Sequence, residues 1–317
     1  MKKLIIIIFL TLTGIGSWAE DRYTGSLLLL HNGEKTGFKP TDFPLAMEQA
    51  VKGDTIIMGE GSYPEITLSK NVKIIGPNDG LFKVLRINMP NEDFQDILIE
   101  SVPISRLYIE SDFNQLTLRH CDICNIVNNN QAQGKITLDK SIIRMENVRD
   151  APPFNAIQSR VYEFFNGNNT DKSKYVFTNC EFRFYVYDIG DRTVPPATYI
   201  NSVFFDPYFN SEDGTTDQQV EFRNSSFESC LFDNTGRYYI NESCTENNSY
   251  RMEHQNWDCS KENLESLGFL GNDGTVVGLY GTANEYRDDM ERPTTSIEDI
   301  VTSGNKMDVR LRLYPNN

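Results

Sequence analysis

Short stretches of alternating apolar and polar residues recur along the middle of the chain at a nearly constant spacing. An octapeptide of the form apolar, any, apolar, any, polar, Cys or Ser, any, Ile or Phe occurs in five clear copies, and a looser copy starts at Ile97. The clear copies are LTLRHCDI from Leu116, ITLDKSII from Ile136, YVFTNCEF from Tyr175, ATYINSVF from Ala197 and VEFRNSSF from Val220. Their starts lie 19 to 23 residues apart except for one gap of 39 residues, which predicts a poorly matching copy near residues 155–164.

The period of this repeat predicts the architecture. Alternation over the first four positions is typical of a strand that buries positions one and three. Position five tolerates the left-handed backbone of a sharp bend, and its residues are His120, Lys140, Asn179, Asn201 and Asn224. The chain then turns and buries positions six and eight. A strand, a bend and a second strand about every 20 residues predict an all-β, right-handed parallel β-helix, whose successive coils stack. Helical repeats are excluded because they need longer units and a 3.6-residue period.

The two ends of the chain differ from this pattern. Residues 43–51 predict a short helix that caps the first coil, with Thr41 or Asp42 available as its N-cap and Pro44 in its first turn. His31, Asn32 and Gly33 are typical of a hairpin turn. We expect clear coils over about residues 54–232 and an irregular C-terminal cap over about 233–317, all within one domain, residues 20–317.

The first 19 residues read as a secretory signal peptide. Met1, Lys2 and Lys3 form a basic head, an apolar run follows, and Ala19 ends the segment on a small residue. No other apolar stretch approaches the ~20 residues that a membrane span needs. The sequence therefore predicts a protein that is secreted, with the periplasm or the cell surface as its destination, and that has no transmembrane segment.

Residues 46–80, AMEQAVKGDTIIMGEGSYPEITLSKNVKIIGPNDG, resemble the opening coil of right-handed parallel β-helix proteins of the pectate-lyase-like superfamily. The shared features are an amphipathic helix, Gly-Asp-Thr-Ile, a Gly-x-Tyr turn and a Val-x-Ile-Ile-Gly strand. The tail, with GNDGTVVGLYG and MDVRLRLY, is similar to the end of secreted β-helix proteins of the Bacteroidetes. The resemblance implies the fold over residues 40–313 and little about activity, since one fold hosts many functions.

Charge narrows the possible partners. The chain has 30 Lys and Arg residues against 45 Asp and Glu residues, a net charge of −15. Nucleic acids and anionic membranes bind basic surfaces, so neither is expected as a partner. A polyuronate would also meet a repulsive field unless Ca²⁺ intervened.

The resemblance implies glycoside hydrolases and polysaccharide lyases as the enzymes to consider. The polygalacturonase-like set of motifs is incomplete here, because its Gly-His-Gly and Arg-Ile-Lys elements are missing. A lyase needs a strong base, often Arg or Lys, and frequently Ca²⁺. The outward octapeptide positions offer Arg119, Asp139 and Arg223, of which Arg119 and Asp139 should lie side by side because coils are ~4.8 Å apart. A surface ion pair is the simpler interpretation of these two residues.

Aromatic residues provide the better candidate for ligand contact. If Phe182, Phe184 and Val186 face inward, then Arg183, Tyr185 and Tyr187 share one exposed face. Tyrosine rings beside a cation suit sugars, which present apolar C–H patches and hydroxyl groups together. The alternative is that a neighbouring loop covers these rings and that they only extend the core.

The six cysteines fall into two groups. Cys121 and Cys180 occupy position six about three coils apart, roughly 14 Å at the ~4.8 Å coil spacing, which is too far for a disulfide. We expect them in a buried stack with Ser141, Ser202 and Ser225. In the less regular region, a disulfide between Cys244 and Cys259 is expected in an exported protein, and Cys230 is the competing partner.

Three functional hypotheses remain. The first is a non-catalytic surface or periplasmic protein that binds a polysaccharide or cell-surface glycan along an exposed face, without a cofactor or metal. The second is a polysaccharide lyase that acts on an acidic glycan with Arg119 or a neighbour as the base and Ca²⁺ as cofactor. The third is a structural or adhesive solenoid that binds protein partners. The outward residues vary from copy to copy, which favours a scaffold over a catalytic site and leaves the enzyme question open.

Overall fold

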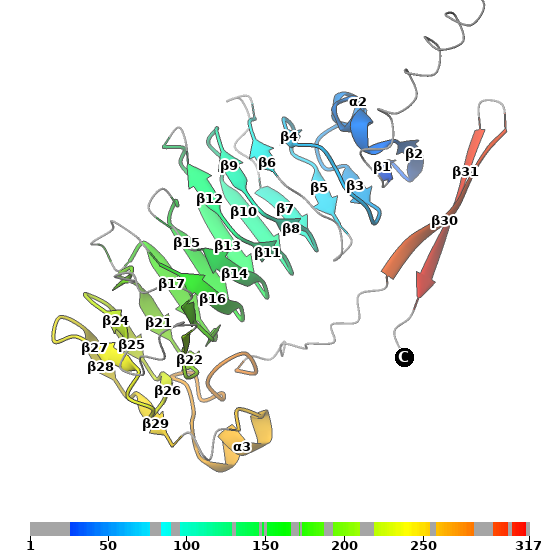
Figure 1. Cartoon of the computed structure of the whole chain (residues 1–317). Helices are drawn as coiled ribbons and strands as arrows, with labels where there is room; N and C mark the ends of the chain where they lie inside the picture. Colours follow the sequence, from blue (N-terminus) through cyan, green and yellow to red (C-terminus); the bar gives the residue numbers. More distant parts are fainter. Residues whose placement is uncertain are drawn as a thin grey trace, which may run out of the picture.

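The chain folds as a parallel β-solenoid of about eight turns (Figure 1). This computed structural model describes residues 26–76, 84–89, 96–128, 131–145, 148, 151–165, 171, 173–186, 193–209, 219–253, 258–281, 294–303 and 306–314. For residues 193, 209 and 294–314 only the backbone is described. The fold class that the octapeptide predicts is confirmed.

One side of the solenoid is a twelve-stranded sheet, called here the long sheet. Its strands pair in parallel from β3 onward, and an antiparallel hairpin extends it at the N-terminal end. In spatial order the strands are β2 (Glu34–Phe38), β1 (Leu27–His31), β3 (Thr55–Met58), β5 (Lys73–Ile75), β7 (Asp96–Glu100), β10 (Gln115–Arg119), β13 (Lys135–Asp139), β15 (Phe154–Ile157), β17 (Tyr175–Thr178), β21 (Thr198–Ile200), β25 (Ser226–Glu228) and β28 (Thr245–Asn247).

The other sides are shorter. The second sheet has eight parallel strands, which are β8 (Pro103–Ile104), β11 (Asp122–Ile123), β14 (Ile142–Met145), β16 (Arg160–Phe164), β18 (Glu181–Phe182), β22 (Val203–Phe204), β26 (Leu231–Asp233) and β29 (Tyr250–Met252). The early coils are completed by β4 (Ile66–Leu68), β6 (Leu85–Ile87), β9 (Leu107–Ile109) and β12 (Ile126–Asn128). The late coils add the pair β19 (Tyr185–Val186) and β23 (Tyr208–Phe209), and the group β20 (Thr193–Val194), β24 (Val220–Phe222) and β27 (Tyr238–Ile240).

The N-terminal end is capped as predicted. In the turn between β1 and β2, Asn32 and Gly33 have φ values of +49° and +84°, as a two-residue hairpin turn requires. A short 3₁₀ turn, η2 (Pro40–Asp42), leads into helix α2 (Phe43–Gln49), which buries Phe43, Ala46 and Met47. Asp42 occupies the N-cap position, but its side chain makes no capping hydrogen bond.

The corner between the long sheet and the second sheet repeats in every coil. One non-glycine residue at each corner has a left-handed backbone, with φ between +46° and +64°. These residues are Ser101, His120, Lys140, Gln158, Asn179, Asn201, Ser229 and Asn248. Left-handed geometry costs about 1–2 kcal/mol for most residues, so the frequent Asn at position five has a backbone cause. The predicted bend is confirmed.

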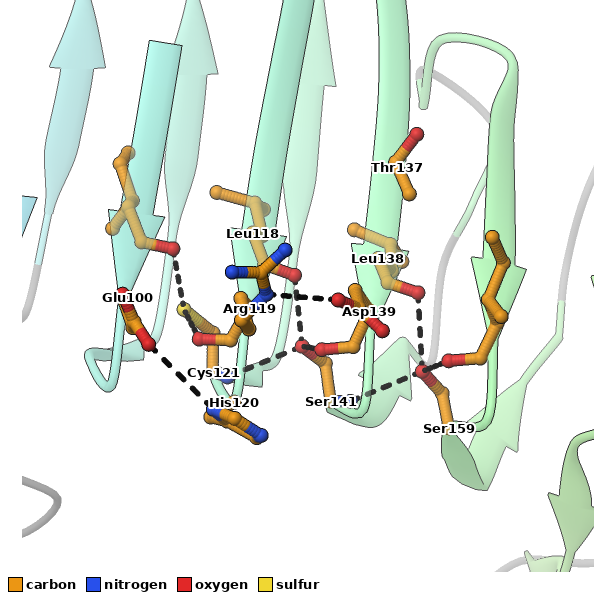
Figure 2. A network of polar contacts seen from close by, with 12 residues as sticks. Glu100, Leu118, Arg119, His120, Cys121, Thr137, Leu138, Asp139, Ser141 and Ser159 are labelled. Atoms are coloured by element: carbon orange, nitrogen blue, oxygen red, sulfur yellow. Dashed lines mark hydrogen bonds and ion pairs between the residues drawn. The ribbon is translucent and has the colours of Figure 1, made fainter. Parts of the chain in front are cut away.

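A column of small side chains follows these corner residues (Figure 2). Its members are Val102, Cys121, Ser141, Ser159, Cys180, Ser202, Cys230 and Ser249. The hydroxyl of Ser141 accepts the backbone N–H of Cys121 at 3.1 Å, and the hydroxyl of Ser159 accepts that of Ser141 at 3.0 Å. Position six is small and often polar because a backbone N–H buried at a corner needs an acceptor.

Two details of the repeat differ from the sequence interpretation. The expected weak copy lies at residues 154–161, with Gln158 at the corner and Ser159 in the column. The copy that starts at Val220 belongs to a different corner, because β24 pairs with β20 and β27 rather than with the long sheet. Cys230, and not Ser225, is therefore the member of the buried column from that coil.

The core changes from aliphatic to aromatic along the solenoid. The inward position of the second sheet is isoleucine in β11 and β14, but the late coils stack Phe182, Phe204 and Phe232, with ring centroids 4.5 Å apart and planes within 9°. On the long sheet, Tyr199 lies between Phe177 and Phe227, at 5.4 and 4.9 Å. Parallel, in-register coils bring like rings together, and each aromatic pair adds about 0.5–1.5 kcal/mol beyond its area burial.

The segment after the last coil folds back along the solenoid. Helix α3 (Lys261–Ser266), capped by Ser260, lies beside β29 (Figure 1). Leu264 and Val277 pack on outward apolar residues of the second sheet. Residues 269–281, called here the strap, then run past the corners. The corner side chains bind it: the Gln158 amide donates to the Leu279 carbonyl at 2.9 Å, and the Asn179 amide donates to the Gly281 carbonyl at 3.3 Å.

The last described element is an antiparallel hairpin of β30 (Thr294–Ser303) and β31 (Lys306–Tyr314). Its pairing contains one irregularity, between Ile297 and Asp299. Within the described ranges, no helix has the length and apolar character required to cross a bilayer.

Candidate functional site

The residues expected to contact sugar lie after the corner of the coil that contains β18. Phe182, Phe184 and Val186 are buried, whereas Arg183 is exposed and Tyr185 is partly buried. The predicted alternation therefore holds over residues 182–186. Tyr187 lies outside the described residues.

Tyr185 belongs to a column of tyrosines that spans three successive coils. Its ring stacks on Tyr162 of β16, with centroids 5.2 Å apart and planes at 19°. On the other side, Tyr208 of β23 makes an edge contact, with centroids 5.9 Å apart and planes at 70°. We call Tyr162, Tyr185 and Tyr208 the tyrosine column. It forms because β19 pairs in register with β23, which places Tyr185 opposite Tyr208.

A cation closes the N-terminal end of this column. The Arg144 guanidinium lies 4.5 Å from the centre of the Tyr162 ring, and Arg144 Nε donates to Asp122 Oδ1 at 3.3 Å. Tyr162 is an extra residue in the β14–β16 pairing, because the register shifts after Ile143. This bulge turns the Tyr162 side chain into line with Tyr185.

The rings of the column are not equally accessible. Tyr162 lies between the Arg144 guanidinium and Tyr185, so both of its faces are covered. Tyr208 is 57% exposed and meets Tyr185 at a steep angle, which leaves it the most open ring of the three. An exposed tyrosine offers an apolar face and a hydroxyl to the same ligand. Tyr208 is therefore the best contact point, and the sequence interpretation missed it.

Arg183 is engaged with its own neighbours. Arg183 Nε donates to Glu181 Oε1 at 2.5 Å, and its guanidinium lies 4.2 Å over the ring of Phe205. The largely buried Glu181 carboxylate also lies 3.3 Å from Arg160 Nε. The Arg183 charge is thus paired within the protein, and its guanidinium packs on Phe205 and Glu181 rather than pointing a free cation at a ligand.

Arg119 and Asp139 lie side by side on the long sheet, as predicted (Figure 2). Arg119 Nε donates to Asp139 Oδ2 at 2.8 Å, and Glu100 occupies the same register position on the preceding strand. Glu100 in turn lies 3.2 Å from Lys73 Nζ and 4.0 Å from His120 Nδ1. The result is a row of alternating charges across neighbouring coils. Such exposed pairs contribute about 0–1 kcal/mol each.

The second arginine considered for catalysis lies elsewhere. Arg223 follows β24, outside the long sheet, so the expectation that it shares a face with Arg119 is wrong. Its Nη2 donates to Glu221 Oε2 at 2.6 Å, and this contact lowers the pKa of the Glu221 carboxyl. Arg119 on the long sheet and Tyr185 on β19 also belong to different sides of the coil. The candidate base and the aromatic surface therefore do not form one site.

The expected disulfide is absent from the structure. All six cysteines lie within the described residues, and none of them forms a disulfide. Cys244 packs against the main core and its thiol donates to the Phe222 carbonyl at 3.3 Å, whereas Cys259 belongs to the separate cluster under α3. The short sequence separation does not bring them together, because the last coil turns between them. Cys230 is buried in the corner column.

Among the side chains that the structure describes, no group of three or more His, Cys, Asp or Glu residues is arranged to hold a metal ion.

The protein is a parallel β-solenoid that carries an outward column of tyrosines on its late coils. No family model, no curated protein and no solved structure matches this chain. The structure is consistent with the β-helix fold that the sequence resemblance implies.

Proposed function

We propose that this protein is an exported, non-catalytic glycan-binding solenoid whose sugar-contacting surface is the tyrosine column. The observation that carries the proposal is the alignment of Tyr162, Tyr185 and Tyr208 on three successive coils, with the most exposed ring at its C-terminal end. Aromatic rings with a polar tip bind the C–H faces and the hydroxyl groups of sugars at once.

The charges around the column favour a neutral glycan. The two nearest arginines are already paired, Arg144 with Asp122 and Arg183 with Glu181. The chain as a whole carries a net charge of −15, which repels a polyuronate. The ring centroids follow one another at 5.2 and 5.9 Å from coil to coil, so the edges of the three rings form one line. We therefore expect the glycan to lie along the solenoid axis.

The lyase hypothesis has less support. The Arg119 guanidinium is engaged in an ion pair with Asp139, so it is already occupied by a partner on the neighbouring strand. The tyrosine column lies on another side of the coil. The proposal has three further parts. The chain belongs to the pectate-lyase-like superfamily, residues 1–19 are a signal peptide, and the protein is located in the periplasm or at the cell surface. Residues 1–19 lie outside the described part of the chain.

The test is equilibrium binding to a panel of neutral and acidic polysaccharides. We expect a neutral glycan to bind, and we expect Tyr208→Ala to weaken its affinity at least tenfold, a loss of about 1.4 kcal/mol. Tyr239 provides a matched control, because it is 48% exposed but lies on β27 outside the column. Tyr239→Ala should leave the affinity unchanged. Unchanged binding in the double variant Tyr185→Ala, Tyr208→Ala would favour the scaffold or adhesin hypothesis.

A further inference from the structure

The last coil of the solenoid departs from the pattern of inward residues. β28 pairs with β25 so that Glu246 follows Phe227, and β29 pairs with β26 so that Arg251 follows Phe232. Phe227 and Phe232 are buried ends of the two aromatic stacks of the core. Charged side chains therefore replace aromatic rings at both inward positions of the same coil.

These two charged residues pair across the end of the core. Arg251 Nη2 donates to Glu246 Oε2 at 2.7 Å. The Arg251 guanidinium also lies 4.4 Å from the centre of the Phe232 ring, so it covers the terminal ring of one stack. Both side chains remain partly exposed, with 40% and 36% of Arg251 and Glu246 accessible. The ion pair thus forms a polar lid directly on the aromatic core.

Among the strands that the structure describes, none lies beyond the last coil. β27, β28 and β29 are each the outermost strand of their sheets, and Thr245, Glu246 and Asn247 are all exposed. The opposite end differs, since α2 and the β1–β2 hairpin pack there. Open strand edges next to an apolar core end are a template for pairing with another chain. Placing charges there makes such pairing unfavourable, because two ion pairs would lose water at the contact.

We propose that the Glu246–Arg251 pair ends the solenoid and prevents its C-terminal end from stacking on the same end of a second copy. The partner that this surface rejects is thus another molecule of the same chain. The proposal is independent of glycan binding, because the tyrosine column involves other residues and other strands.

The test is sedimentation velocity of the mature chain over a wide range of protein concentration. Wild type should show one concentration-independent coefficient. The double variant Glu246→Phe, Arg251→Phe continues both aromatic stacks to the surface, and it should sediment faster as concentration rises. The charge-reversed control Glu246→Arg, Arg251→Glu keeps an ion pair and should behave like wild type.

A milder double variant, Glu246→Gln, Arg251→Met, covers the case in which the phenylalanine variant fails to fold. It removes both charges and leaves side chains of similar size at the same positions, so it should also self-associate. Circular dichroism establishes that each variant retains its strands. The proposal is overturned if the folded phenylalanine variant and the folded Glu246→Gln, Arg251→Met variant both sediment like wild type at every concentration.

Discussion

At the scale of single residues, burial determines how the cysteines behave. Cys180 and Cys230 are fully buried in the corner column, and desolvation raises the pKa of each thiol to about 12. Their thiols donate to backbone carbonyls, such as that of Ala156 for Cys180 and that of Tyr199 for Cys230. Their role is therefore that of small buried core residues, not of reactive thiols. The secreted context suggested by the sequence had favoured a disulfide instead.

This difference predicts a labelling pattern. At about pH 8 a thiol with its pKa raised to about 12 is almost entirely protonated, and the thiolate is the reactive form. Iodoacetamide should therefore label the exposed Cys124 in the native protein and spare Cys180 and Cys230. After unfolding without a reductant, all six cysteines should be labelled. Mass spectrometry would contradict the structure by finding a peptide that links Cys244 to Cys259.

At the scale of elements, the corner residues have two roles. Their left-handed backbone makes the bend, and their side chains bind the strap. The Asn201 amide is buried, donates to Asn272 Oδ1 at 3.0 Å and accepts the Asn272 backbone N–H at 2.9 Å. Asn224 has the same backbone geometry, with φ of +49°, but its side chain is exposed. Comparing variants of the two residues therefore separates the contribution of the bend to the free energy of unfolding from the contribution of the strap.

Glycine variants at these two positions test the division. Glycine adopts the left-handed backbone without steric cost, which offsets its larger entropy in the unfolded chain, so Asn224→Gly should change the free energy of unfolding by less than about 1 kcal/mol. Asn201→Gly also loses buried hydrogen bonds, and we expect a further loss of about 1–3 kcal/mol. Urea denaturation measures both free energies of unfolding. Equal losses in the two variants would mean that the strap does not depend on Asn201.

The elements also show which parts of the site the sequence could predict. The corner and the buried column are local, so residues such as Asn179 and Cys180 signal them in every copy. The partners of Tyr185 do not occupy a fixed position in the repeat. Tyr162 lies three residues after Ser159, the small buried residue of its coil, whereas Tyr208 lies six residues after Ser202, the small buried residue of its own coil. A bulge in β16 and a different path into β23 bring these tyrosines into line.

At the scale of the whole molecule, the stacking of coils accounts for most of what is observed. In-register coils produce the aromatic ladders inside and the charge row of Glu100, Arg119 and Asp139 outside. The strap was not predictable, because it is held by side-chain amides that donate to backbone carbonyls and carries no recurring motif. The copy at Val220 misled the interpretation because a second corner uses the same left-handed residue and small neighbour.

A glycan that lies along the tyrosine column should shield the rings from oxidation, and hydroxyl-radical footprinting measures this shielding. The protein is oxidised with and without its tightest-binding neutral polysaccharide, and the modified tyrosines are quantified by mass spectrometry. The glycan should protect Tyr208 and Tyr185 and leave the oxidation of the exposed Tyr239 unchanged. Equal oxidation of Tyr208 and Tyr185 with and without the bound glycan would contradict it.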